Sequence, residues 1–219
     1  MFRDREDAAL QLAERLRGRP LREPLVLAIP RGGVVIGAIL ARALEADLDV
    51  ILARKLRAPG QPELAIGAIS ETGDLFLNID VADASEELDD YLDKERRFQL
   101  AEIARRRQLF RGVRPAAPIA GRSVILTDDG IATGSTMIAA LKVVKAQGAG
   151  EIIVAVPVAS PDRLREVRRW CDDVVCLLVP EWFWAIGQFY EDFSQVEDAE
   201  VVELLRRFAP AEASNQNPV

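Results

Sequence analysis

One stretch, Val124 to Thr136, constrains the fold of this chain more than any other. It reads VILTDDGIATGST, in which an apolar, β-branched run gives way to two adjacent carboxylates and then to small and hydroxyl-bearing residues. Such a run is typical of a buried parallel strand. After it, Met137, Leu141 and Val144 recur at helical spacing. The stretch therefore predicts a strand, a short polar loop and the start of a helix.

This junction predicts a ligand that carries both phosphate and hydroxyl groups. Small side chains leave the backbone N–H groups of Thr133 to Thr136 uncovered, and the helix dipole adds partial positive charge there. The carboxylates of Asp128 and Asp129 repel phosphate, but they accept hydrogen bonds from neighbouring hydroxyls and can hold a hydrated magnesium ion. Ribose 5-phosphate has both features.

Other phosphate-binding motifs fit this stretch less well. A P-loop requires G-x-x-x-x-G-K-[ST], whereas Gly130 and Gly134 are one residue too close and no lysine precedes Ser135. The dinucleotide fingerprint G-x-G-x-x-G is also absent. The remaining alternative is an ordinary strand-to-helix turn whose acidic residues are merely solvated.

VILTDDGIATGST resembles the ribose-phosphate signature of the type I phosphoribosyltransferases, which transfer ribose 5-phosphate from phosphoribosyl pyrophosphate (PRPP) to a nitrogenous base. The resemblance implies that Asp128 and Asp129 are catalytic, that they hold the ribose hydroxyls, and that they bind the expected cofactor, Mg²⁺, mainly through water. The 5-phosphate loop implied by the same resemblance comprises Ala132, Thr133, Gly134, Ser135 and Thr136.

A second junction of the same kind lies earlier in the chain. The apolar run Leu25 to Ile29 is followed by Pro30, Arg31, Gly32 and Gly33 and then by a helical pattern. Glycines let backbone N–H groups approach an anion, and a guanidinium donates paired hydrogen bonds to it. PRGG resembles the pyrophosphate loop of the same family, which implies that Arg31, as a catalytic group, binds pyrophosphate together with both glycines.

Two further cations are predicted to bind pyrophosphate. Arg54 and Lys55 follow an expected strand, Leu48 to Ala53, and ligands gather at the carboxyl ends of parallel strands. A solvated basic pair is the alternative. The Gly- and Pro-rich segment that comes next predicts a mobile excursion with a short hairpin, and it resembles the flexible loop that closes over PRPP in the family.

Aromatic residues concentrate in the segment PEWFWAIGQFYEDF, where helical periodicity fails. They predict either a satellite hydrophobic cluster or a flat surface on which a planar base stacks. WAIGQFYED resembles the segment that bounds the base pocket in hypoxanthine-type transferases. This resemblance implies that Trp184 stacks on the base and that Ile186 offers backbone groups to its edge. It also implies that Glu191 lies near the metal-bound pyrophosphate and binds the metal, mainly through water.

Strands alternate with helices along the chain, which predicts an α/β fold with a doubly wound, Rossmann-like and mainly parallel sheet. We expect the type I phosphoribosyltransferase fold with a small hood and a long extra helix. The expected organisation is a single domain (1–209) with its core at about 24–180, a hood from about 1–20 and 180–195, the long helix at about 83–110, and a disordered tail at 210–219.

The long helix is rich in charges and longer than the core requires. Its apolar residues either face a partner subunit, which predicts a homodimer, or pack within the same subunit. These residues are Leu88, Leu92, Phe98 and Ile103.

Composition excludes several other functions. The formal net charge of -7 argues against general nucleic-acid binding, and the absence of histidine excludes histidine-based triads and metal sites. Cys171 and Cys176 do not form a C-x-x-C pair, which favours buried thiols in a reducing compartment. We see no signal peptide and no apolar run long enough to span a bilayer, so we expect a cytoplasmic protein without membrane contact.

The predicted activity is a magnesium-dependent transfer of ribose 5-phosphate from PRPP to a nucleobase, as in nucleobase salvage. Ala132 occupies a position where 6-oxopurine transferases usually carry an aspartate, so the acceptor base stays open. A PRPP-binding regulatory protein without turnover is the alternative. A hydrolase that uses Asp128 as nucleophile lacks its usual D-x-D spacing.

Overall fold

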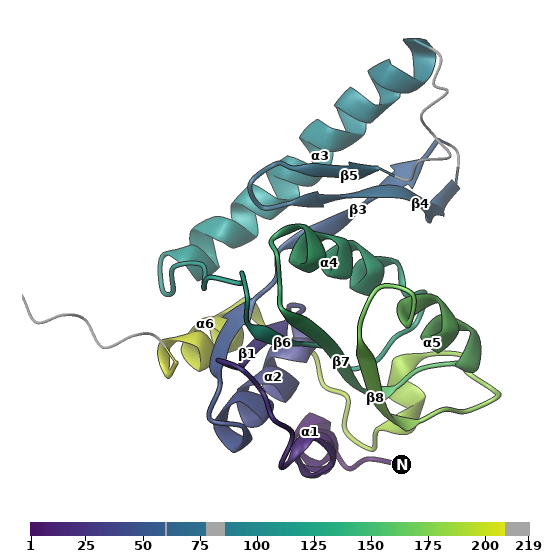
Figure 1. The fold of residues 1–219 in the computed structure, drawn as a ribbon. Coiled ribbons are helices and arrows are strands. Elements are labelled where there is room, and N and C mark those ends of the chain that lie inside the picture. Colours follow the sequence, from purple (N-terminus) through teal and green to yellow (C-terminus); the bar gives the residue numbers. More distant parts are fainter. Residues whose placement is uncertain (60, 78–85, 209–219) are drawn as a thin grey trace, which may run out of the picture.

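A five-stranded parallel sheet forms the centre of the protein. The structure is a computed structural model and describes residues 1–59, 61–77 and 86–208 (Figure 1). Across the sheet the strands lie in the order β2 (Asp47–Val50), β1 (Leu25–Ala28), β6 (Ser123–Thr127), β7 (Glu151–Val158) and β8 (Asp173–Leu178).

The direction of winding reverses between β1 and β6. From β1 the chain runs through α2 (Gly32–Ala43) to β2 on one side, and from β6 it runs through α4 (Ser135–Ala146) to β7 on the other. The two central strands are in register, with Ala28 opposite Thr127. Because parallel strands end at the same edge, the loops that follow them emerge side by side, and ligands of open α/β sheets bind at such a switch point.

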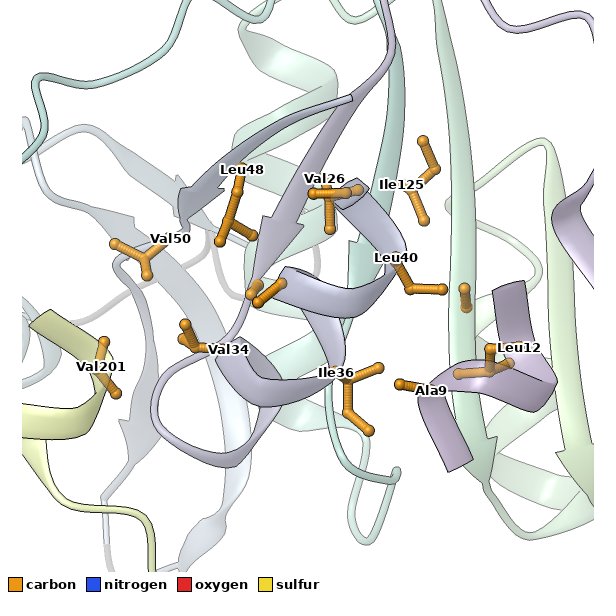
Figure 2. Close-up of a cluster of buried hydrophobic side chains, with 14 of the residues drawn as sticks. Ala9, Leu12, Val26, Val34, Ile36, Leu40, Leu48, Val50, Ile125 and Val201 are labelled. Carbon is orange, nitrogen blue, oxygen red and sulfur yellow. The ribbon is translucent and has the colours of Figure 1, made fainter. Parts of the chain in front are cut away.

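Helices cover both faces of the sheet, which explains why the inner strands β1, β6 and β7 are mostly apolar. On one face α1 (Arg5–Leu16) and α2 pack against the strands, and Figure 2 shows Leu12 and Ile36 within this cluster. α6 (Asp198–Arg206) adds Val201 to the same cluster. On the other face α4 and α5 (Pro161–Val167) cover a second cluster. Each fully buried Leu or Ile contributes about 1.5–3 kcal/mol relative to an exposed one.

An antiparallel appendage stands beside the core (Figure 1). It consists of β3 (Ala53–Ala58), β4 (Gln61–Ser70) and β5 (Leu75–Leu77), with α3 (Glu86–Arg111) alongside. Arg111 at the end of α3 anchors it to the core: Nη1 lies 2.6 Å from Asp49 Oδ1 in β2, and Nη2 lies 2.7 Å from Glu71 Oε1 after β4.

The predicted strand at Leu48 to Ala53 is wrong at its end. β2 stops at Val50, two buried residues turn the chain, and Ala53 already begins β3. The continuous apolar run hid this turn, because a buried turn and a buried strand have the same hydrophobicity. Arg54 and Lys55 therefore lie in the second sheet and not at the carboxyl end of a core strand.

The predicted hairpin after Lys55 is confirmed as the β3–β4 pair, and β5 forms the edge of that sheet beside β4. The predicted long helix is α3, although its expected first residues, 83–85, and the expected tail, 210–219, lie outside the described residues. Ile103 of α3 is buried within the subunit, whereas half of Phe98 is exposed beneath the Arg57 guanidinium. Among the described helices, none is long and apolar enough to cross a bilayer.

Candidate active site

The loops after β1 and β6 bring the two predicted phosphate and ribose motifs into contact. A Cβ atom on Gly32 would lie 1.9 Å from Asp129 Oδ2, and one on Gly33 would lie 2.9 Å from Asp128 Cα. Any side chain at either position would therefore displace the opposite loop. The structure thus places the predicted pyrophosphate loop directly against the predicted ribose carboxylates.

The two carboxylates form a strongly coupled pair. Asp128 is half-buried and its Oδ1 accepts a 2.8 Å hydrogen bond from the Asp129 N–H, while Asp129 is buried. Burial, and then the neighbouring charge of Asp129, raise the pKa of Asp128 well above its ordinary value. Burial also raises the pKa of Asp129, although the Arg5 guanidinium opposes that shift. Negative charge is therefore costly here without a cation.

Two residues of the hood hold Asp129 in place. Arg5 of α1 places Nε and Nη2 each 2.9 Å from Asp129 Oδ2, and the two side chains are only 11% and 13% exposed. Its Cζ lies 3.9 Å from the centre of the Phe193 ring. Tyr190 Oη donates a 2.7 Å hydrogen bond to the Asp129 carbonyl oxygen. The hood thus reaches the sheet edge through Asp129.

Sequence reasoning missed both of these residues. Arg5 left one local signal: it is a cation at the first position of a helix, where the helix dipole favours acidic residues. Such a residue needs a partner outside its own helix, and Asp129 provides it. Tyr190 left only its place in the aromatic segment.

The predicted 5-phosphate loop forms the start of α4. Gly134 precedes the helix with a φ of 80°, a left-handed conformation that suits glycine, and Ser135 begins it. The Ile131 N–H donates to the Val158 carbonyl oxygen at 2.9 Å, which fixes the loop to β7. The N–H groups of a first helical turn lack intrahelical acceptors, so Thr133 and Thr136, both exposed, flank a ready anion site.

The residues predicted from the aromatic segment lie in different surroundings. Ile186 begins a short 3₁₀ helix, η2 (Ile186–Phe189), and lies against the carboxylate loop: a Cβ atom on Gly130 would be 2.8 Å from Ile186 Cγ2. Trp184, by contrast, is 85% exposed. Glu191 is exposed too, and its N–H donates to the Phe2 carbonyl oxygen at 2.8 Å.

The predicted pyrophosphate ligands come from two sheets. Arg31 lies in the loop after β1, with Nη1 3.5 Å from Glu197 Oε2. Arg54 in β3 donates from Nε to Gln99 Oε1 at 2.6 Å, and Lys55 is its half-buried neighbour. Near both Arg31 and Arg54 lies a residue that sequence reasoning did not assign to the site, Arg106 of α3. Its Nη1 lies 3.4 Å from the Pro30 carbonyl oxygen.

The residues at this edge fit magnesium only in part. Within the described residues, no group of three acidic or cysteine side chains forms a metal cage. The Asp128 carboxyl, half-buried and with a raised pKa, is the kind of group that a dication stabilises, and magnesium usually keeps several waters and substrate oxygens. Asp129 already has a cationic partner in Arg5.

A cavity lies away from this edge of the sheet. This cavity, of about 310 Å³, is bounded by β2, the end of α3 and α4. Three of its four charged residues, Asp49, Glu71 and Arg111, pair with one another, and the fourth is Arg107. The cavity therefore offers less unsatisfied chemistry than the edge formed by β1 and β6.

The edge at β1 and β6 combines a Gly-rich loop bearing an arginine, two adjacent carboxylates and a helix N-terminus. A family model described as the phosphoribosyl transferase domain matches residues 3–194. The chain belongs to this family. The predicted family is thereby confirmed, and the matched range includes α1, the source of Arg5, as well as both central loops.

Two curated relatives carry names that agree with this family. Two curated Mycobacterium tuberculosis proteins, named "Putative phosphoribosyl transferase Rv0571c" and "Putative phosphoribosyl transferase MT0597", are each 44% identical over 207 residues, which is 94% of this chain and 47% of theirs. The chain therefore spans about half the length of these relatives.

Among solved structures, TT1426 from Thermus thermophilus is similar with a TM-score of 0.90 and 44% identity, covering 95% of this chain and 99% of that one. AQ2163 from Aquifex aeolicus, at 13% identity and a TM-score of 0.50, covers 84% of this chain and 76% of its own, and shows only that the fold is shared. The predicted fold class is confirmed.

Proposed function

We propose that this protein transfers ribose 5-phosphate from PRPP to a nitrogenous base, as in nucleobase salvage, and releases pyrophosphate. One observation carries the proposal: Gly32 and Gly33 lie so close to Asp128 and Asp129 that one ligand can contact both loops. That ligand needs an anionic group beside Arg31 and hydroxyls beside the carboxylates. PRPP has both, joined at ribose C1.

The carboxylate loop and the start of α4 would bind the sugar. Asp128 and Asp129 accept hydrogen bonds from the two ribose hydroxyls, and the N–H groups of Thr133 to Thr136 donate to the 5-phosphate. The helix dipole favours that phosphate. These contacts hold C1 at the mouth of the Arg31 loop, and positioning of this kind supplies much of the rate enhancement in a two-substrate reaction.

In the reaction the bond between ribose C1 and the pyrophosphate oxygen breaks, and its electron pair leaves with pyrophosphate. A nitrogen of the base then bonds to C1, and the proton that it loses passes to solvent or to pyrophosphate. Arg31 stabilises the negative charge that develops on the leaving oxygen. When bound through water to Asp128, magnesium would supply further charge neutralisation, as dications do for phosphates.

The acceptor base would lie beyond ribose C1, beside η2. Ile186 already lies against Gly130 and would offer backbone groups to the edge of the base. Trp184 is exposed and would cover the base by stacking. Ala132 provides no carboxylate toward the base, so ring-nitrogen proton transfer would rely on other groups.

We further place the protein in the cytoplasm, as a homodimer without nucleic-acid or membrane partners. Cys171 and Cys176 are free thiols, and burial raises the pKa of each to about 11, which keeps them in the unreactive protonated form. A net charge of -7 disfavours polyanionic partners. Half-exposed Phe98 on α3 is a candidate for the subunit contact.

Mass spectrometry tests the activity. Protein incubated with PRPP, Mg²⁺ and a mixture of purine and pyrimidine bases should form one new nucleoside monophosphate, whose mass identifies the base. Asp129→Asn is the control and should form none. If the wild-type protein leaves PRPP intact but still binds it, the protein is a PRPP-responsive regulator instead. If it does not bind PRPP, the proposed site is wrong.

A further inference from the structure

Four arginines gather beside the loop that contains Arg31. Arg54 comes from β3, and Arg105 and Arg106 come from α3, so three separate elements contribute. Arg106 lies among the other three: their charges each disfavour its protonated form. This concentration of positive charge runs against the chain as a whole, whose formal net charge is -7. Such a cluster needs a compensating anion.

Arg106 is the least satisfied member of the cluster. Its Nε is buried and, among the described residues, has no hydrogen-bond partner. Its Nη1 reaches only the Pro30 carbonyl oxygen, at 3.4 Å, which is a long hydrogen bond. Burial, and then the charge of Arg54, lower the pKa of its guanidinium, and the nearby charge of Asp198 offsets this shift only in part. A buried cationic donor without a partner is costly, and proteins retain such groups where a ligand completes them.

The acidic residues near the cluster do not balance it. In the described part of the chain, the start of α6 offers two carboxylates: Glu197 pairs with Arg31 at 3.5 Å, and Asp198 pairs with Arg105 at 3.1 Å. Arg54 has a neutral partner, Gln99. Two carboxylates therefore face four guanidinium groups, and the pairing of Arg31 with Glu197 is long enough to be replaced by a better anion.

We propose that Arg106 of α3 is a pyrophosphate ligand, which joins the leaving-group site from the side of the Pro30 carbonyl oxygen. This inference rests on the proposed function, because it takes pyrophosphate to be the anion at the Arg31 loop. Guanidinium forks match phosphate oxygens, so the free Nε and a terminal nitrogen of Arg106 can donate together to one phosphate group. Arg54 supports the same phosphate from β3. The long helix thus belongs to the substrate site.

A purely structural role for Arg106 makes a different prediction. If Arg106 only helps to hold α3 against the Pro30 loop, its loss should lower stability and weaken all ligands of the site alike. If it binds pyrophosphate, its loss should weaken ligands that carry a diphosphate and spare a ligand that lacks one. Ribose 5-phosphate is such a ligand, since it occupies only the carboxylate loop and the start of α4.

Isothermal titration calorimetry with pyrophosphate, PRPP and ribose 5-phosphate, each with Mg²⁺, separates these roles. Arg106→Gln should weaken pyrophosphate and PRPP binding by about ten- to a hundredfold, as expected for one charge-assisted hydrogen-bonding group. Ribose 5-phosphate binding should change less than about twofold. Arg107→Gln is the matched control, because Arg107 is the next residue of α3 and is exposed; it should leave all three affinities unchanged.

A second variant keeps the test valid if Arg106→Gln folds poorly. Arg106→Lys retains the charge without the fork, and it should bind pyrophosphate with an affinity between those of wild type and Arg106→Gln. Wild-type pyrophosphate affinity in both variants would overturn the inference and leave the proposed function standing. If Arg106→Gln loses pyrophosphate binding while the wild-type protein fails to bind PRPP, Arg106 is still an anion ligand, but the proposed function is wrong.

Discussion

The two ends of the candidate site carry opposite charge and are built differently. At one end, Asp128 and Asp129 lie on a single loop, and Arg5 pairs with Asp129. At the other end, the arginines beside Pro30 outnumber their carboxylate partners. The first end suits hydroxyl groups and a metal ion, and the second suits a polyanion. A substrate that joins a diol to a diphosphate fits this division of charge. Substitutions at each end test whether the two ends differ in this way.

The largest expected effect follows the loss of Arg5, which would leave Asp129 buried without a counter-charge. Arg5→Ala should lower the free energy of unfolding by about 3–5 kcal/mol, the usual cost of removing one partner of a buried pair. Urea denaturation measures it. Arg17→Ala, just after the same helix, is the control: its pair with Glu14 is exposed (74% and 61%) and should contribute about 0–1 kcal/mol. Equal effects would show that Arg5 does not hold Asp129.

A smaller effect is expected where the two ends meet. Gly32→Ala would place a methyl group 1.9 Å from the present position of Asp129 Oδ2, so the carboxylate must move away from Arg5. We expect a loss of about 1–3 kcal/mol in stability and of PRPP binding.

Gly130→Ala provides the comparison for Gly32→Ala. Its methyl group would lie 2.8 Å from Ile186 Cγ2 and 3.0 Å from Val158 Cγ1, so a similar loss of about 1–3 kcal/mol in stability is expected, but the Asp129 carboxylate stays beside Arg5. If Gly32→Ala bound PRPP as the wild type does, the loops would not face a common ligand.

The carboxylate end should also show a pH signature. Because the pKa of Asp128 is raised in the folded state, its protonated form is favoured there, and wild-type stability falls as pH rises from the ordinary value through that raised value. Asp128→Asn removes this dependence. In the absence of ligand it should be more stable than wild type by on the order of 1 kcal/mol at pH 8, with the difference vanishing below the ordinary pKa of 3.8.

Thermal unfolding of both proteins between pH 4 and pH 8 tests this expectation. A constant difference across the range would mean that Asp128 does not titrate in the folded protein as described.

The smallest effect on stability is expected at Trp184, where the acceptor base is proposed to bind. Trp184 is 85% exposed, so Trp184→Ala should change the free energy of unfolding by less than about 0.5 kcal/mol. It should nevertheless weaken the binding of the acceptor base, since stacking on an aromatic side chain contributes about 1–3 kcal/mol. Phe193→Ala, which removes the ring beneath Arg5, should instead reduce stability. An unchanged KM for the base in Trp184→Ala would remove Trp184 from the base site.

The carboxylate end could be predicted from sequence because its chemistry lies in consecutive residues. Asp128 and Asp129 follow a strand directly, as Arg31 follows another, and the rule that parallel strands end at one edge brings these loops together. Arg5 could not be placed in this way, because it contacts Asp129 across 124 residues of sequence. Such a contact depends on how the hood packs, which no local pattern encodes.

The arginine end shows a second limit. Arg54 was predicted to follow a core strand, but it lies in β3. The buried turn after Val50 has the same hydrophobic pattern as a continued strand. Arg106 lies in a run of three arginines that reads as a solvated helix face, and only the packing of α3 against the Pro30 loop distinguishes it from exposed Arg105 and Arg107. Periodicity predicts that a helix exists, but not which of its charges become buried.

Competition calorimetry tests most directly whether the two ends form one site. Ribose 5-phosphate and pyrophosphate should each bind the wild-type protein, and saturation with PRPP, at one molecule per chain, should abolish the binding of both. If pyrophosphate still bound to the PRPP-saturated protein with unchanged affinity, the arginine cluster and the carboxylate loop would be separate sites, and a single PRPP site that spans both ends would be contradicted.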